Sequence, residues 1–227
     1  MYTQPSLETT TSLALSLRGI HAGWYLNILL VSFFVNPFCI SAQASNDSVQ
    51  IAGIIKEANQ QLISHRYQEA FQFAQDAFDK STKFDFKWGM INSLLVMGQS
   101  QKAMSNYPTS LNYYLQALAE IEKRNDPMSL EWINEKLGEL FQDWGVPEKA
   151  LPYYKTALSF QKGDADDLIG KLAEVYLSLD QKDKSLDMYQ QFLKLKKEKG
   201  DTTQTISTLE KIASIYYQSG DIENSLK

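Results

Sequence analysis

Apolar residues recur along residues 49–226 at the spacing of short amphipathic helices that follow one another in pairs. The pattern is clearest in residues 136–158, which read KLGELFQDWGVPEKALPYYKTAL. The segment Gly145-Val146-Pro147 separates the two helices, because glycine suits a helix end and proline is tolerated in a first helical turn. Small and aromatic residues share one face of each helix: Leu137, Gly138, Phe141, Ala150, Tyr154 and Ala157. We therefore predict two antiparallel helices whose backbones approach closely at Gly138 and Ala150.

The same unit recurs through the chain with a nearly constant period. The position of Ala150 is repeated at steps of 40, 40, 35 and 40 residues, at Ala70, Ser110, Ala150, Ser185 and Ser225. Twelve residues before each of these stands another small residue: Ala58, Gly98, Gly138, Ala173 and Ala213. Five units that keep one phase over so much of the chain predict a helical repeat protein.

The pattern resembles the tetratricopeptide repeat (TPR), in which a small residue and an aromatic on helix A pack against Ala, aromatic and Ala on helix B. The first two units are weaker matches, because Gln61 and Gln101 stand where helix A has its aromatic. The resemblance implies an all-α fold: a right-handed superhelical solenoid of antiparallel helix pairs, with about five repeats over residues 45–227. The last repeat is cut at Lys227, so we expect the repeats to continue in a longer chain.

Turn-forming residues predict where the helices are connected. Residues 99–107 are expected to connect the two helices of the second pair, and Lys162-Gly163-Asp164 to connect the third pair to the fourth. Asp126 is well placed to cap the helix that follows it.

Two further local features concern the carboxyl-terminal third. The lysine-rich run 194–199 is interpreted as the solvated end of a helix that closes at Gly200. In the last helix pair, the first helix is assigned to residues that include Ile206, Leu209, Ile212, Ala213, Ile215 and Tyr216.

Residues 1–44 are interpreted as a secretory signal peptide. No Asp, Glu, Lys or Arg occurs from Gly19 to Asn46, and this stretch follows Arg18 and contains a long apolar run. It ends in Ala42-Gln43-Ala44, small residues at the −3 and −1 positions of a cleavage site. We predict cleavage after Ala44 and export to the periplasm or cell envelope; an uncleaved membrane anchor is the alternative.

Composition and motifs give no sign of catalysis. The net charge of −5 disfavours nucleic acid as a partner, because nucleic acid requires a basic surface. His65 has no Cys or His at ligand spacing, and no phosphate-binding loop or nucleophile motif occurs. We therefore expect no enzyme activity, no cofactor and no metal.

The resemblance implies that helix A residues at repeat positions two, five, nine and twelve line a concave binding face. The second repeat then presents Asn92, Leu95, Gln99 and Lys102. The later repeats present Trp132, Glu135, Glu139, Gln142, Asp167, Gly170, Glu174, Leu177, Ser207, Glu210, Ser214 and Tyr217.

The groove at repeats three to five is thus expected to be acidic, with Trp132, Leu177 and Tyr217 as apolar contacts. A basic or mixed peptide or protein segment is the expected partner, and Trp132 the first candidate for a contact residue. The alternative is that the carboxylates only solvate this face. Trp88 and Trp144 are left open between packing and surface.

Three functions fit these observations. The first is an exported, non-catalytic module that binds a peptide or protein on its concave face. The second is the extracytoplasmic sensor region of a longer membrane signalling protein, such as a sensor histidine kinase, because exported repeats of about this length resemble such regions. In either case, contact with a membrane is expected only through the leader or through a part beyond Lys227. The third is a cytoplasmic adaptor, which requires that residues 1–44 are not a signal.

Overall fold

The computed structural model describes residues 37–161 and 165–225. The chain divides into two units, residues 1–47 and residues 48–227. The predicted leader lies outside the described residues up to residue 36, and residues 37–44 belong to the first described helix. The described residues form ten helices and no strand, which confirms the all-α prediction.

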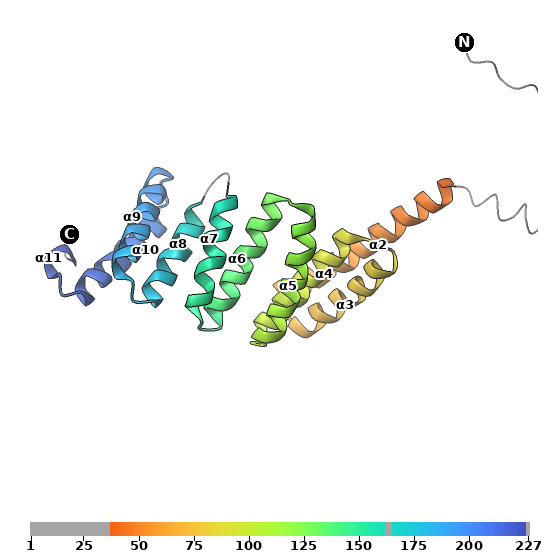
Figure 1. Cartoon of the computed structure of the whole chain (residues 1–227), viewed down its shortest axis with the longest axis horizontal. Helices are drawn as coiled ribbons and strands as arrows, with labels where there is room; N and C mark the ends of the chain where they lie inside the picture. Colours follow the sequence, from red (N-terminus) through yellow and green to blue (C-terminus); the bar gives the residue numbers. More distant parts are fainter. Residues whose placement is uncertain (1–36, 162–164, 226–227) are drawn as a thin grey trace, which may run out of the picture. The chain divides into compact units, whose positions relative to one another are not determined.

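Five helix pairs follow one another along the chain. They are α2 (Pro37–Ile63) with α3 (Tyr67–Lys83), α4 (Lys87–Ala103) with α5 (Tyr107–Arg124), α6 (Pro127–Asp143) with α7 (Pro147–Phe160), α8 (Asp166–Ser178) with α9 (Lys182–Glu198), and α10 (Thr202–Gln218) with α11 (Ile222–Ser225). From α3 onward each helix packs against the next one in sequence (Figure 1). Such nearest-neighbour packing is that of a solenoid, as predicted.

Small residues hold the two helices of a pair together. A Cβ added to Gly138 would lie 2.6 Å from the ring of Tyr154, and one added to Gly98 would lie 2.6 Å from the ring of Tyr114. The tyrosine ring therefore lies directly against the backbone of the facing helix. Ala150, Tyr154 and Ala157 are fully buried, which confirms the predicted register.

At Ser110 and Ser185, serine replaces alanine at the repeated position without leaving a buried hydroxyl unsatisfied. The Ser110 hydroxyl donates to the backbone oxygen of Gly98 at 2.7 Å, and the Ser185 hydroxyl donates to that of Ala173 at 2.8 Å. Each acceptor is the small residue twelve positions earlier. The spacing read from the sequence is therefore a direct contact between helices.

The connections within pairs are tighter than predicted. α4 continues to Ala103, so the predicted connection at 99–107 is wrong and only residues 104–106 connect α4 to α5. The chain reverses at Ser105, which has a φ of 60°. His65, Asp85 and Asp180 adopt the same left-handed conformation, which glycine usually supplies. The positions of glycine and proline in the sequence therefore do not predict these helix ends.

Asp126 caps α6 as predicted, accepting from the backbone N–H of Ser129 at 3.2 Å, and Gly200 follows α9 with a φ of 71°. The predicted turn at residues 162–164 lies outside the described residues.

One prediction about side chains in the carboxyl-terminal third is wrong. Lys196 is not solvated: its Nζ lies 2.5 Å from the carboxylate of Asp166, and both side chains are at least nine-tenths buried. On α10, Ile206 and Leu209 are exposed. The face of α10 that packs on the preceding pair is formed by Ile215 with Ile212 at its edge, and helical geometry turns residues 206 and 209 away from it.

Gly138→Leu should destabilise the fold by about 1–3 kcal/mol, because the new side chain overlaps the ring of Tyr154. Chemical denaturation followed by circular dichroism measures the difference. Gly53→Leu is the control, since a Cβ at Gly53 in α2 meets no atom within 4 Å. Equal stability of the Gly138→Leu variant and the wild type would contradict the assigned contact.

Candidate functional site

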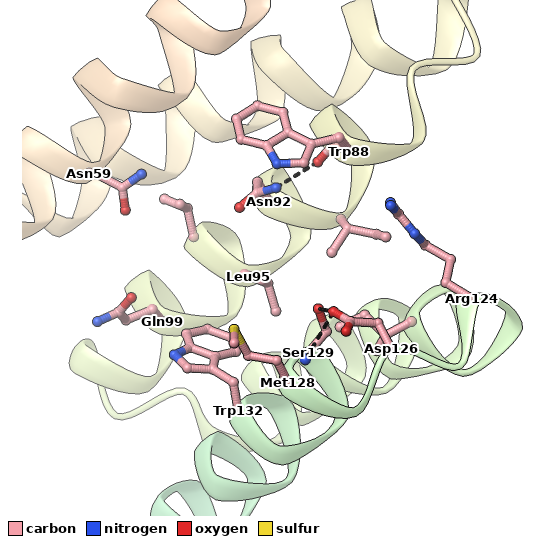
Figure 2. A pocket seen from close by; sticks show the side chains of 13 residues that line it. Asn59, Trp88, Asn92, Leu95, Gln99, Arg124, Asp126, Met128, Ser129 and Trp132 are labelled. Atoms are coloured by element: carbon pink, nitrogen blue, oxygen red, sulfur yellow. Dashed lines mark hydrogen bonds between the residues drawn. The ribbon is translucent and has the colours of Figure 1, made fainter. Parts of the chain in front are cut away.

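A pocket of about 510 Å³ lies between α4, the end of α5 and the amino-terminal half of α6. We call it the tryptophan pocket. Its wall includes Trp88, Asn92, Leu95, Gln99, Met128 and Trp132, with Asn59 and Arg124 at its edges (Figure 2). Four of these, Asn92, Leu95, Gln99 and Trp132, were predicted for the concave face.

The pocket gathers large apolar side chains that the fold leaves partly in water. Trp88 is 44% exposed, Trp132 37% and Met128 78%. Figure 2 shows the two indoles on opposite sides of the hollow with Leu95 between them. Removing such surface from water is favourable by about 25 cal/mol per Å². A partner that fills the space between the indoles would therefore gain free energy from burial.

Neighbouring side chains hold the indoles in place. The ring of Phe86 lies 5.7 Å from that of Trp88, and the ammonium of Lys136 lies 5.7 Å from the ring centre of Trp132. Lys136 is itself paired with Glu139 at 2.9 Å. Fixed aromatic side chains lose little conformational entropy when a partner binds.

The amide groups at the pocket are oriented by the helices that carry them. The side-chain N–H of Asn92 donates to the backbone oxygen of Trp88 at 2.8 Å, and that of Asn59 donates to the backbone oxygen of Ile55 at 2.9 Å. Each asparagine therefore keeps its side-chain oxygen free to accept. Gln99 makes no hydrogen bond through its side chain with any described residue.

Ion pairs join the A helices further along the chain. Lys171 of α8 pairs with Glu135 and Glu139 of α6, and Lys211 of α10 pairs with Glu174 of α8 at 2.5 Å. Between α4 and α6, Lys102 pairs with Asp143 at 2.8 Å and approaches Glu139 to 3.9 Å. We call these contacts the charge ladder.

The charge ladder neutralises most of the carboxylates that were expected to make the concave groove acidic. Glu135 and Glu139 are about four-fifths buried and face lysines, so repeats three and four do not present the free acidic surface that the sequence indicated. The lysines were missed because they stand at other repeat positions or on neighbouring repeats. The expected preference for a basic partner loses its main support here.

The pKa values in the ladder reflect this pairing. Burial acts to raise the pKa of the Glu139 carboxyl, but hydrogen bonds from Lys171 and Lys136 outweigh it and hold the pKa below its ordinary value. Burial acts to lower the pKa of Lys171, and its bonds to Glu135 and Glu139 raise it above the ordinary value. Both groups are thus charged at neutral pH.

A second, more polar pocket of about 380 Å³ lies between α8, α9 and α10. Asp167 and Glu174, both predicted for the binding face, line it together with Lys171 and Lys211. Its charged groups are paired: Lys211 with Glu174, Lys171 with the two α6 carboxylates, and Asp167 with Lys196 at 3.3 Å.

Comparison with known proteins supports a helical repeat. The sequence profile of the tetratricopeptide repeat family matches residues 168–203. No curated protein sequence matches the chain.

Solved structures match most of the chain. A putative kinesin light chain from Podosopora anserina with nearly identical TPR-like repeats has a TM-score of 0.66 at 12% identity, covering 78% of this chain and 90% of that one. A signal transduction ATPase with a TPR sensor from Pyrococcus horikoshii has a TM-score of 0.67 at 14% identity, covering 75% and 28%. A Rap protein in complex with competence and sporulation factor has a TM-score of 0.60 at 14% identity, covering 78% and 61%.

The fold is that of a tetratricopeptide-repeat solenoid. The matched residues include the whole of α9 and most of α8, which form the fourth of the predicted repeats. The tryptophan pocket lies in the first three repeats, and the predicted concave positions of the TPR solenoid reach it from α4 and α6.

The remaining predicted residues of the TPR solenoid are dispersed. Gln142 accepts from the Tyr154 hydroxyl at 2.8 Å and donates to Glu174. Leu177 packs against the core between α8 and α10. Glu210 and Tyr217 are exposed on α10 and line neither pocket.

Two tryptophans that the sequence left open are now assigned. Trp144 stacks on Phe141 and Tyr107, with ring centres 5.9 Å apart in both cases, so it serves packing. Trp88 lines the tryptophan pocket. Met128 and Arg124 were missed because they lie at the end of α5 and the start of α6, outside the repeat positions assigned to the binding face.

No group of three or more His, Cys, Asp or Glu in the described part of the chain is placed to hold a metal ion. Within the same residues, no helix is both long enough and apolar enough to cross a membrane.

Glu139→Gln should lower the free energy of unfolding at neutral pH by about 1–2 kcal/mol, because it removes a partly buried partner of two lysines. The folded-state pKa of Glu139 lies below its ordinary 4.5, so its contribution is present above that pH and is lost as pH falls through the folded-state pKa. Denaturation at neutral pH and near pH 3 should show the difference between variant and wild type shrinking in acid.

Glu131→Gln is the matched control for this prediction. Glu131 lies on the same helix and forms no ion pair with a described residue. If both variants lost the same stability, or if the loss caused by Glu139→Gln did not depend on pH, the charge ladder would not stabilise the solenoid.

Proposed function

We propose that this chain is a non-catalytic protein-interaction module that binds a segment of a partner protein in the tryptophan pocket. The observation that carries the proposal is the pair of partly exposed tryptophans facing each other across Leu95. Tryptophan is enriched among residues that dominate binding energies, and it binds best where the site is already formed.

The polar groups at the pocket suit a peptide. A peptide backbone offers N–H donors at regular intervals, and the free side-chain oxygens of Asn59 and Asn92 can accept them. The apolar wall would take a bulky side chain of the same segment. A pocket of about 510 Å³ has room for one or two such side chains rather than for a folded domain.

Export is part of the proposal and rests on the sequence of residues 1–44. Under this reading the module acts in the periplasm or cell envelope after cleavage following Ala44. The structural likeness to an ATPase with a TPR sensor supports a second candidate, in which the repeats are the sensor region of a longer signalling protein.

Replacement of both tryptophans should weaken peptide binding at least about 30-fold, since each is placed to act as a hot-spot residue. The purified chain would select binders from a displayed library of random peptides, and the Kd of synthetic copies would be compared between the wild type and Trp88→Ala/Trp132→Ala. Tyr217→Ala is the control, because Tyr217 is 70% exposed and lies outside the pocket. A library that yields no binder, or peptides that bind the double variant equally well, would contradict the proposal.

Cell fractionation tests the proposed location. The chain expressed with a carboxyl-terminal tag should appear as a shortened species in the periplasm or medium, and Ala42→Arg/Ala44→Arg should block the shortening. A full-length species confined to the cytosol would contradict export. Retention of the chain in the membrane fraction would favour the anchored alternative.

A further inference from the structure

The cationic side chains near the tryptophan pocket differ in whether they have a carboxylate partner. Every lysine on α4, α5 and α6 lies within 4 Å of a carboxylate: the pairs are Lys87–Asp85, Lys102–Asp143, Lys123–Glu120 and Lys136–Glu139. Arg124 forms no ion pair and no side-chain hydrogen bond with any residue that the structure describes. It is also the one cation of these helices that lines the pocket.

Asp126, the acidic residue that also lines the pocket, is engaged as a helix cap and forms no ion pair with Arg124 among the described residues. Asp126 accepts from both the backbone N–H and the hydroxyl of Ser129, which fixes it as the cap of α6. Arg124 contributes to the low pKa of Asp126, although the Ser129 hydroxyl is the main cause. Figure 2 shows the guanidinium extending along the edge of the pocket, away from this cap.

The opposite edge of the pocket has the complementary character. Asn59 lies across the hollow from Arg124 in Figure 2. One N–H of its amide, and one of the Asn92 amide, is used within the helix, and the side-chain oxygen of each can accept a hydrogen bond. A bound segment therefore meets acceptors on one side, indoles in the middle and an unpaired cation on the other side.

We propose that the tryptophan pocket selects an apolar residue accompanied by an Asp or Glu side chain, which pairs with Arg124, in a segment whose N–H groups face Asn59 and Asn92. This proposal rests on the proposed function and adds to it the charge of the partner. It replaces the basic partner expected from the sequence with an acidic one. Arginine suits this role because its planar guanidinium binds a carboxylate through two parallel hydrogen bonds.

The location of Arg124 indicates an internal carboxylate rather than a chain terminus. Arg124 is exposed at the rim, where an extended segment can pass on in either direction, and the buried wall of the pocket carries no cation. An acidic side chain can reach the rim without the segment having to end there.

The test uses a peptide enriched on the wild-type chain, synthesised with an amidated carboxyl terminus in two forms that carry either Glu or Lys beside the apolar residue. The wild type should bind the Glu form about 3–5-fold more tightly, as expected for an exposed ion pair, and the difference should shrink in high salt. Arg124→Gln should remove the preference, and Arg124→Glu should reverse it in favour of the Lys form.

Lys123→Glu is the matched control, because it makes the same change of charge at the adjacent residue, whose side chain is 67% exposed and paired with Glu120. It should keep the preference for the Glu form. Equal effects of Lys123→Glu and Arg124→Glu would reduce the preference to net charge and overturn the proposal. Binding only by peptides with a free terminal carboxylate would also overturn it.

The outcomes separate the two proposals. Binding that depends on Trp88 and Trp132 but not on Arg124 would leave the proposed function in place and remove the acidic partner. Binding that depends on none of the three residues would remove both.

Discussion

The contact between a small residue on the first helix of a pair and a tyrosine on the second determines how these helices lie. Gly98 and Gly138 leave no room for a Cβ because the rings of Tyr114 and Tyr154 occupy that space. The helices of a pair can then approach closely enough for the next pair to stack on them. The tyrosine also links the two helices of the pair, because the Tyr154 hydroxyl donates a hydrogen bond to Gln142 on the first helix. The buried Tyr114 hydroxyl has no hydrogen-bond partner among the described residues, since Lys102 stands at the position of Gln142 and turns instead to the next repeat.

The charge ladder explains why the tryptophan pocket opens where it does. Between α6 and α8 and between α8 and α10, lysines and carboxylates meet along the facing surfaces of the A helices. Between α4 and α6 the pair of Lys102 and Asp143 lies at the carboxyl-terminal ends of both helices. Nearer the amino-terminal ends, the two helices carry mainly apolar and amide side chains, and these form most of the pocket wall. Ion pairs thus occupy one part of this surface, and partly exposed apolar side chains occupy another.

Sequence reasoning reached part of the candidate site. The repeat register placed Trp132, Leu95 and Asn92 on the face where the pocket lies, because residues of one helical face can be counted from the buried ones. It also predicted a free acidic groove at Glu135, Glu139 and Glu174, whereas the structure pairs all three with lysines. Apart from Lys136, which lies three residues from Glu139 on the same helix, their lysine partners are 32 to 37 residues away in sequence. The spacing of residues along one helix does not show which lysine of a neighbouring repeat pairs with a given carboxylate.

The sequence by itself determined the helix pairs, their period and the contact between residues twelve apart, such as Ser110 with Gly98. These follow from local periodicity and from the short connections that force consecutive helices to pack. Only the tertiary structure decided which charges meet and that Lys196 is buried against Asp166. It also decided that Arg124 lines the pocket with two tryptophans and pairs with no carboxylate among the described residues. The reason is physical: an ion pair or a pocket depends on the distance between side chains from different repeats. That distance is set by how the repeats stack and not by the spacing within any one of them.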